Sequence, residues 1–346
     1  MVQSKLQYIN PIIYKNWDDH IKTLKNTSFF YSSFWAKVLH QSYGYVPMYF
    51  AEISKNRLNF LLPLMEIKSR ITGNRAVSLP FTDHCDPIIP DKSYFKNFLN
   101  DIVVFGENGG WKYLEFRGGS ELFRDKNSSL QYYQHLLSLS DEKTLFAGLK
   151  SNTKRNIKKA EREGVCVSID NSSDAMDNFY ALNCITRKKH GLPPQPKQFF
   201  KNIYENIIKN NYGNILIAKK DNRCLAAAIF FHFSKTVIYK YGASDVKYLH
   251  LRANNLVMWE AIKNYALQNF DTFDFGKTEI SNEGLRRFKL GWGAEEKMIN
   301  YYKYDFSVKN FVNEKNKESG WYNYFFKKMP LPILKAAGNM LYKHVG

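Results

Sequence analysis

Cations and glycines are concentrated in residues 276–293, directly after residues 273–275, a short apolar alternation typical of a strand. The cations are Arg286, Arg287 and Lys289, and the aromatic residues interleaved with them are Phe288 and Trp292. These three cations lie within one turn, in a segment too rich in glycine to be a long surface helix. Positive charge that buried aromatic residues hold in place could bind a phosphate. It could also stabilise the negative charge that develops at a reacting carbonyl. The glycines would let a ligand approach the backbone closely.

A second basic cluster lies in SNTKRNIKKAEREG, residues 151–164, which has the start and stop signals of a helix. Arg155 and Lys159 fall on neighbouring turns of this helix and could hold an anion, because arginine suits bidentate phosphate contacts. A solvated helix face is the ordinary alternative. Arg187, in TRKKHGLPPQP, ends another helix, where cations suit the helix dipole. The proline-rich loop that follows could form one wall of a cleft.

Two carboxylates are candidates for orienting an amine or accepting its proton. Asp274 lies in the strand TFDFG, and Asp83 follows a strand in SLPFTDHCDP, where it could instead satisfy the backbone of a turn. Tyr239 and Tyr241 are expected on one face of the strand IYKYGAS. Tyrosines on strands are more often half-buried sheet residues than catalytic groups.

The composition restricts the classes of protein and of site. The chain has 346 residues, a net charge of +18 and a pI near 9.5, which favours anionic partners, although a compositional bias could produce the same charge. The four cysteines form no CxxC pair and the eight histidines no HExxH motif, so we expect no metal site and no disulfide framework. Reduced thiols and the lack of a signal peptide or a long apolar stretch predict a cytoplasmic protein.

Helix and strand signals alternate in both halves of the chain, which predicts an α+β fold. The order helix, strands, helix, strand occurs once in residues 32–118 and again in residues 151–276. This weak repeat indicates two copies of one unit, residues 1–145 and residues 146–304, each a mixed sheet flanked by helices, with a cleft between them. We expect residues 305–346 to pack back on the first unit.

Several motifs, taken together, resemble the FemAB-like branch of the GNAT acyltransferase superfamily. They are LKSNTKRNIKKAEREGV, RKKHGLPPQPKQFF, YKYGASD and FDFGKTEISNEGLRRFKLGWGAEE, and the resemblance covers about residues 29–304. The family implies two tandem GNAT-like units and transfer of an aminoacyl or acyl group to an amine of an anionic cell-envelope precursor, such as a peptidoglycan or lipid-linked glycan intermediate. The resemblance implies aminoacyl-tRNA or acyl-CoA as co-substrate, and no tightly bound cofactor.

By the same resemblance, Phe288 and Lys289 match the family's Phe-Lys pair, in which the lysine stabilises the charge that develops as the amine attacks. Arg155 and Lys159 match basic positions that would hold substrate phosphates or the end of a tRNA, and Tyr241 matches a cleft-facing tyrosine. Asp274, Asp83 and the substrate itself stay open as proton acceptors. Arg187, Arg286 and Trp292 complete the expected substrate-binding set.

The chain also departs from the family's pattern. The helical arm of some bridge-forming relatives is missing, which weakens the case for a peptidoglycan substrate, and so is the RxxGxG loop of CoA-dependent enzymes. Two alternatives are a CoA-dependent acetyltransferase of surface-polysaccharide synthesis and a non-catalytic module that binds tRNA or a membrane surface. Residues 321–346 form a basic amphipathic tail that could contact the inner face of the membrane or pack on the first unit.

Overall fold

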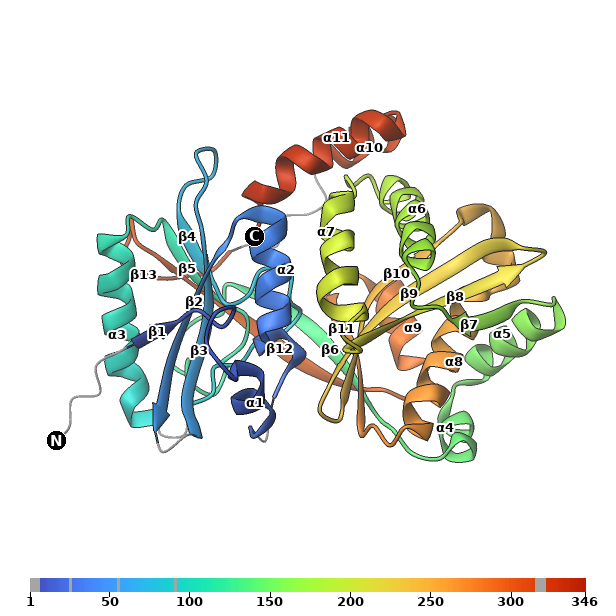
Figure 1. Ribbon diagram of the computed structural model, residues 1–346, viewed down its shortest axis with the longest axis horizontal. Coiled ribbons are helices and arrows are strands. Elements are labelled where there is room, and N and C mark those ends of the chain that lie inside the picture. The colour runs from blue at the N-terminus through green and yellow to red at the C-terminus, as the bar shows by residue number, and fades with distance from the viewer. Residues whose placement is uncertain (1–6, 25–26, 55–56, 90–91, 315–321) are drawn as a thin grey trace. The chain divides into compact units, whose positions relative to one another are not determined.

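The computed structural model describes residues 7–24, 27–54, 57–89, 92–314 and 322–346. The chain forms two compact units, shown in Figure 1. The first comprises Met1–Tyr132, Met298–Asn316 and Leu341–Gly346, and the second Tyr133–Lys297 and Lys317–Met340. The division therefore falls at Tyr132 instead of the expected 145. Residues 317–340, which we expected on the first unit, are grouped with the second.

The first unit is built on a mixed sheet. Its strands are β1 (Gln7–Ile9), β2 (Val46–Ser54), β3 (Arg57–Ile67), β4 (Arg75–Val77), β5 (Tyr113–Phe116), part of β12 (Glu295–Asp305) and β13 (Asn310–Val312). The strands follow the order β1-β2-β3-β4-β5-β12, with β13 paired to β12. All of these pairs are antiparallel except β4 with β5.

Helices cover this sheet. They are α1 (Trp17–Lys22), the short 3-10 helix η1 (Phe29–Tyr31), α2 (Ser33–Tyr43), α3 (Lys92–Asn108) and the 3-10 helix η4 (Tyr342–His344). Phe95 and Ile102 of α3 pack into a buried cluster with Phe60 and Leu62 of β3. The alternating apolar residues of β3 thus meet the apolar stripe of α3, as the two periodicities predict.

The second unit contains the motifs that could carry chemistry. Its elements are β6 (Leu130–Ser138), α4 (Glu142–Gly148), α5 (Ser151–Arg162), β7 (Cys166–Ile169), α6 (Ser173–Lys189), α7 (Lys197–Ile203), the π-turn η2 (Tyr204–Ile208), β8 (Gly213–Lys220), β9 (Arg223–Phe233), β10 (Thr236–Ser244), the 3-10 helix η3 (Val246–Leu251), α8 (Ala253–Leu267), β11 (Thr272–Glu279), α9 (Glu283–Leu290), α10 (Tyr322–Lys328) and α11 (Leu331–Leu341). The strands follow the order β7-β8-β9-β10-β11-β6.

The predicted meander β8-β9-β10 is confirmed, because both strand pairs are antiparallel. The β8–β9 turn places Asp221 and Asn222 at positive φ, 48° and 61°, the conformation that two-residue hairpin turns prefer. On one sheet face, Ala226 and Phe230 of β9 are buried in a cluster with residues of α5 and α8. On the other, Tyr241 of β10 packs against Phe200 of α7. The α+β prediction is confirmed.

A β-bulge in β10 corrects one sequence-based expectation. The register against β9 shifts between Tyr239 and Tyr241, so one extra residue lies on this strand. Tyr239 packs on Phe230, on the α8 side of the sheet, whereas Tyr241 lies among aromatic rings of α6 and α7. The prediction that both tyrosines share one face is therefore wrong.

Among the described residues, no helix is long and apolar enough to cross a membrane.

Candidate functional site

The sheet of the second unit opens where β10 and β11 separate. These two strands pair in parallel only over Thr236–Ile238 and Thr272–Asp274, at the start of each. Beyond these pairs, β10 runs on to Ser244 and β11 to Glu279 without further pairing between them. A gap between parallel strands at the edge where they end is a common place for a ligand in α/β structures.

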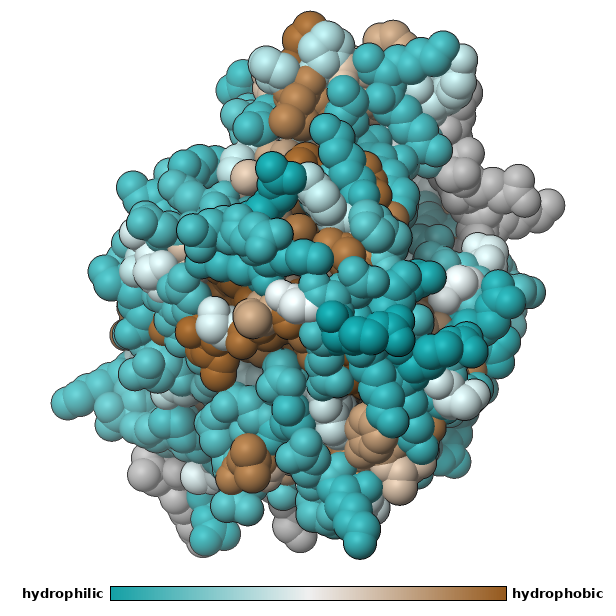
Figure 2. All heavy atoms as spheres, turned by 90° about the vertical axis from the view of Figure 1, so that its right-hand side faces the viewer, coloured by the Kyte–Doolittle hydropathy of each residue, from teal (hydrophilic) through white to brown (hydrophobic). Residues whose placement is uncertain are grey.

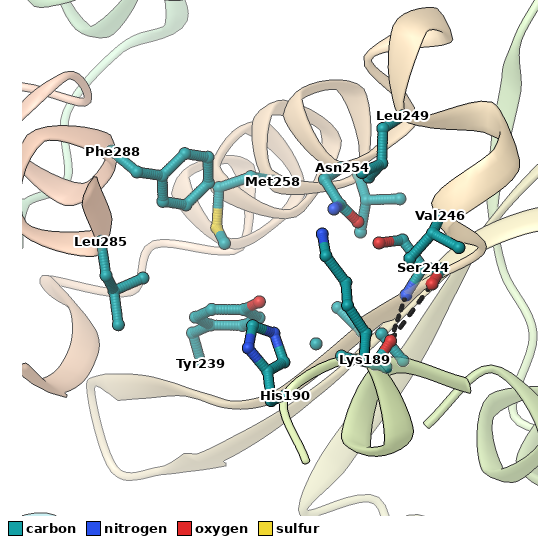
Figure 3. Close-up of a pocket in the computed structure, with 15 residues that line it drawn as sticks. Lys189, His190, Tyr239, Ser244, Val246, Leu249, Asn254, Met258, Leu285 and Phe288 are labelled. Atoms are coloured by element: carbon teal, nitrogen blue, oxygen red, sulfur yellow. Dashed lines mark hydrogen bonds between the residues drawn. The ribbon is translucent and has the colours of Figure 1, made fainter. Parts of the chain in front are cut away.

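A cavity of about 300 Å³ lies at this opening (Figure 3). Its lining residues come from the end of α6, from β9 and β10, from η3, from the start of α8 and from α9. They are Thr186, Lys189, His190, Ala228, Tyr239, Gly242, Ala243, Ser244, Val246, Leu249, Asn254, Val257, Met258, Leu285 and Phe288. Most of these side chains are apolar, and a few polar groups converge on the cavity, which is typical of a site for a small organic ligand.

Two local contacts shape the wall formed by β10. The Thr186 hydroxyl donates to the Ser244 carbonyl oxygen (3.1 Å) and accepts from the Ser244 amide (3.0 Å), which fixes the end of α6 to β10. Tyr239 lies directly over Gly242, where any Cβ would overlap its hydroxyl group. Burial raises the pKa of Tyr239 to about 12, so this phenol stays neutral at physiological pH.

Lys189 gives the rim of the cavity a positive charge. Lys189 and His190 are both lining residues, and Figure 3 shows the Lys189 side chain extended toward Asn254. Burial and the neighbouring cations Lys189, Arg187 and Lys327 lower the pKa of the His190 imidazole. An anionic group bound here would relieve the repulsion among these cations.

The first turn of α8 adds a further attraction for anions. Asn254 is in this turn and lines the cavity. The N-cap residue, Arg252, has a φ of 60° and makes no side-chain capping hydrogen bond. The amide groups of a helix N-terminus carry partial positive charge and bind phosphate or carboxylate groups.

The helix α9 presents two different faces. Leu285 and Phe288, three residues apart, line the cavity. Arg286 and Lys289 have the same spacing but contact other groups. Asn282 caps the helix, since its side chain accepts from the Leu285 amide (3.1 Å). Phe288 therefore faces the cavity, whereas the predicted cations Arg286 and Lys289 of the same short helix point elsewhere.

Lys289 is buried, with 2% of its surface exposed. Its ammonium group donates to the carbonyl oxygens of Gly276 (2.8 Å) and Lys277 (2.9 Å). Both carbonyls belong to the part of β11 that has separated from β10. A buried cation requires such partners, and once fixed it acts strongly on nearby charge because water is excluded.

A histidine that the sequence analysis missed lies in the electrostatic field of this lysine. His135 of β6 is fully buried, and its Nε2 is 3.0 Å from a Glu296 carboxylate oxygen. Arg286 donates two hydrogen bonds of 2.7 Å to the same carboxylate and lies over the ring of Tyr133, 4.3 Å from its centroid. These bonds lower the pKa of Glu296, so it is a carboxylate and His135 Nε2 is the donor.

His135 Nδ1 therefore carries an acceptor lone pair. Burial and the Lys289 cation lower the pKa of the imidazole, so it is neutral at physiological pH. Among the described residues, no hydrogen-bond partner of Nδ1 is found. The only sequence signal was a histidine within the strand LQYYQHLLS, and its pairing with Glu296 could not be foreseen from that.

Asp274 is held in a defined position on β11. One carboxylate oxygen accepts from the Gly276 amide (2.7 Å) and the other from the Gln134 side chain (2.7 Å). Gly276 itself has a φ of 71°, a conformation that favours glycine. Asp274 and Lys289 thus both contact the backbone of Gly276.

Of the predicted site residues, Phe288 lines the cavity, and the others, Lys289 and Asp274 included, do not. Arg155 is exposed and Lys159 half-exposed on α5. Arg187 donates through Nε to the Pro193 carbonyl oxygen (3.4 Å), within the proline-rich loop. Tyr241 lies on the opposite sheet face, and the carbonyl oxygen of Asp83, in the first unit, accepts from Tyr301 (2.6 Å).

The glycines around Trp292 serve the chain itself. A Cβ on Gly291 would lie 2.6 Å from the Thr153 hydroxyl oxygen, and one on Gly293 would lie 3.2 Å from the Gly148 carbonyl oxygen. Trp292 is buried between them and packs against Phe288, with ring centroids 5.9 Å apart. The lack of a side chain at these two glycines thus lets the α4–α5 junction pack closely against them. We had expected a ligand to make this close approach. Among the described residues, no group of histidine, cysteine or acidic side chains could hold a metal ion.

Comparisons with known proteins agree with this geometry. Residues 147–304 match the acetyltransferase (GNAT) domain family. The UDP-N-acetylmuramoylpentapeptide-lysine N(6)-alanyltransferase of Weissella viridescens is 24% identical over 161 residues, 44% of this chain and 46% of that protein. The solved structure of FemX matches with a TM-score of 0.69 over 84% of this chain and 95% of that chain, at 13% identity. Residues 147–304 thus resemble a GNAT acyltransferase domain, and the chain as a whole is similar in fold to FemX.

A tandem GNAT protein of the clavulanic acid biosynthesis pathway also shares the fold of this chain. It covers 87% of this chain and 98% of its own, with a TM-score of 0.55 and 8% identity. The predicted tandem of two GNAT-like units is thereby confirmed. The curated alanyltransferase is matched over less than half of its length, and the GNAT domain match begins after β6.

Proposed function

We propose that this protein transfers an acyl or aminoacyl group to an amine of an anionic cell-envelope precursor. The observation that carries the proposal is the cavity at the separation of β10 and β11, because it combines an apolar wall with a cationic rim. The apolar wall suits an acyl group with its linker. Lys189, His190 and the first turn of α8 suit the phosphates of the donor.

The buried lysine supplies the electrostatic part of the reaction. Nucleophilic attack of an amine on an ester or thioester builds negative charge on the carbonyl oxygen, and a preorganised cation lowers the energy of that state. Lys289 follows the lining residue Phe288 directly in the chain and is fixed by two backbone carbonyls. We assign it the stabilisation of this developing charge.

The ammonium group of the acceptor must lose a proton before its nitrogen can attack. Two groups near Lys289 can accept one. Asp274 is held beside Gly276, and His135 presents the open Nδ1 lone pair. His135 is fully buried, so it would act only if substrate binding opened a path to it.

The proposed acceptor rests on the similarity to the Weissella alanyltransferase and on the charge of this chain. The Weissella relative acts, by its name, on the lysine of a UDP-linked muramoyl pentapeptide. Such a precursor carries phosphates and a primary amine, which agrees with a protein of net charge +18. A lipid-linked precursor with the same two groups is equally compatible.

Donor competition tests the proposal. Fluorescently labelled alanyl-tRNA is titrated with the protein near physiological salt, and acetyl-CoA is added as competitor. Saturable binding, followed by transfer of alanine to the UDP-linked pentapeptide, supports aminoacyl transfer. Displacement by acetyl-CoA supports a thioester donor in the same cavity. If alanyl-tRNA and acetyl-CoA both bind, but binding disappears with modest salt and no transfer is seen, the proposed enzymatic function is contradicted. That result would favour a basic binding module.

A further inference from the structure

The last two helices of the second unit carry an unusual surface. Residues 322–340 contain no acidic residue and three lysines, Lys327, Lys328 and Lys335. Large apolar side chains on α10 and α11 are turned to solvent: Tyr322 (45% exposed), Tyr324 (66%), Phe325 (58%), Ile333 (54%) and Met340 (60%). Figure 2 shows apolar side chains at the surface near the top of the view, where these helices lie.

The packing of α11 shows that this exposure is one-sided. Leu334 and Gly338, four residues apart, are buried, and a Cβ on Gly338 would overlap the Pro194 carbonyl oxygen. Ile333 and Met340, seven residues apart, lie on the other side and are exposed. The helix therefore has two apolar faces, one against the protein and one toward solvent, whereas a surface helix normally has a polar outer face.

The lysines lie beside this apolar surface. The Lys328 ammonium group is 4.3 Å from the centroid of the exposed Tyr324 ring, whereas that of Lys335 is 5.3 Å from the ring of Tyr180, a buried residue of α6. Lysines that flank exposed aromatic side chains can reach lipid headgroups while the rings enter the boundary between headgroups and acyl chains. Because this region has no acidic side chain, the negative charge of an anionic bilayer repels none of its side chains.

We propose that α10 and α11 dock the protein on an anionic lipid bilayer. The exposed rings and aliphatic side chains enter the interface, and Lys327, Lys328 and Lys335 contact the lipid phosphates. The helices lie in the plane of the interface and do not span it, in agreement with the absence of a spanning helix among the described residues.

The docking surface lies next to the rim of the cavity. A Cβ on Gly191, at the end of α6, would overlap the Asn323 carbonyl oxygen of α10, and Lys327 is close enough to lower the pKa of His190. Binding to a bilayer would therefore bring the rim residue His190 near the headgroups. The docking itself does not depend on the proposed reaction, because no donor or acceptor takes part in it.

Vesicle flotation tests the proposal with the full chain. Vesicles of phosphatidylcholine alone are compared with vesicles of phosphatidylcholine and phosphatidylglycerol in equal parts. We expect binding to the mixed vesicles and little to phosphatidylcholine alone. The double variant Tyr324→Ser/Phe325→Ser should lose about tenfold or more in partitioning. Lys327→Gln/Lys328→Gln should lose about tenfold on the mixed vesicles only.

Two matched controls separate docking from general surface properties. Leu267→Ser removes a side chain that is 77% exposed at the end of α8. Lys143→Gln/Lys201→Gln removes two exposed charges from α4 and α7. Both controls should bind as the unchanged protein does, and thermal unfolding confirms that every variant is folded. Absence of binding to the mixed vesicles, or equal losses in the controls and the α10 variants, would overturn the proposal.

Discussion

The Tyr239 hydroxyl group occupies the space that a side chain at Gly242 would need. Tyr239 lines the cavity and Gly242 lies beyond the bulge on the same strand, so the two residues together set the shape of the wall formed by β10. The φ of Gly242 is not in the left-handed region, so the requirement for glycine here is the space taken by Tyr239.

Gly242→Ala should therefore displace Tyr239 and destabilise the protein. Inserting a methyl group into a packed site costs about 1–3 kcal/mol. Gly284→Ala is the matched control, because its nearest neighbour, the Asn282 side chain, would be 3.8 Å away and alanine favours the helix α9. Chemical denaturation measures both free energies of unfolding. Equal stability of the two variants would contradict the close contact.

The buried histidine predicts how stability depends on pH. Because the pKa of His135 is lower in the folded chain than its ordinary value near 6.5, the unfolded chain takes up a proton first as the pH falls. This contribution to the free energy of unfolding is complete above about pH 6.5 and declines below it. His190 and His232 act in the same direction, since their pKa values are also lowered.

His135→Gln should reduce that sensitivity while keeping a donor for Glu296. Thermal unfolding between about pH 7.5 and about pH 5.5 should show a smaller decrease in Tm than in the unchanged protein. His250→Gln, at an exposed position, serves as the control. If the Tm of both variants decreases as much as that of the unchanged protein, the assignment of His135 as a buried neutral imidazole is wrong.

Filling the cavity should weaken donor binding without unfolding the protein. Val246 lines the cavity and is 38% exposed, so Val246→Trp can occupy the space from its edge. We expect the Kd of the donor to rise about tenfold, as the loss of a well-filled apolar site implies. Leu267→Trp, on the exposed end of α8, should leave it unchanged. Equal Kd values for both variants would place the donor elsewhere.

The elements of the second unit could be predicted because their signals are local. The helix at 151–162, the meander and the strand before Gly276 follow from periodicity, caps and turns. The tandem arrangement was indicated by the order of elements. The burial of Trp292 was expected because this residue was interpreted as an aromatic anchor for the neighbouring cations, and it is confirmed.

The details that position the site depend on contacts between distant residues. His135 and Glu296 meet from β6 and β12, and neither strand shows the pairing by itself. The bulge after Tyr239 reverses the face of Tyr241, and a single extra residue leaves no periodic signal. A glycine such as Gly291 marks a close approach, but the sequence does not show whether a ligand or Thr153 approaches it.

The role of Lys289 is tested most directly by removing its charge and keeping its length. The rate of acyl transfer by Lys289→Met is measured with the donor and acceptor selected by the competition experiment, beside Lys297→Met, an exposed lysine of β12. We predict that kcat falls about 10²–10³-fold while KM changes little, since the cation stabilises charge that exists only in the transition state. A kcat within about threefold of the unchanged protein, in a folded variant, would contradict the role assigned to this lysine.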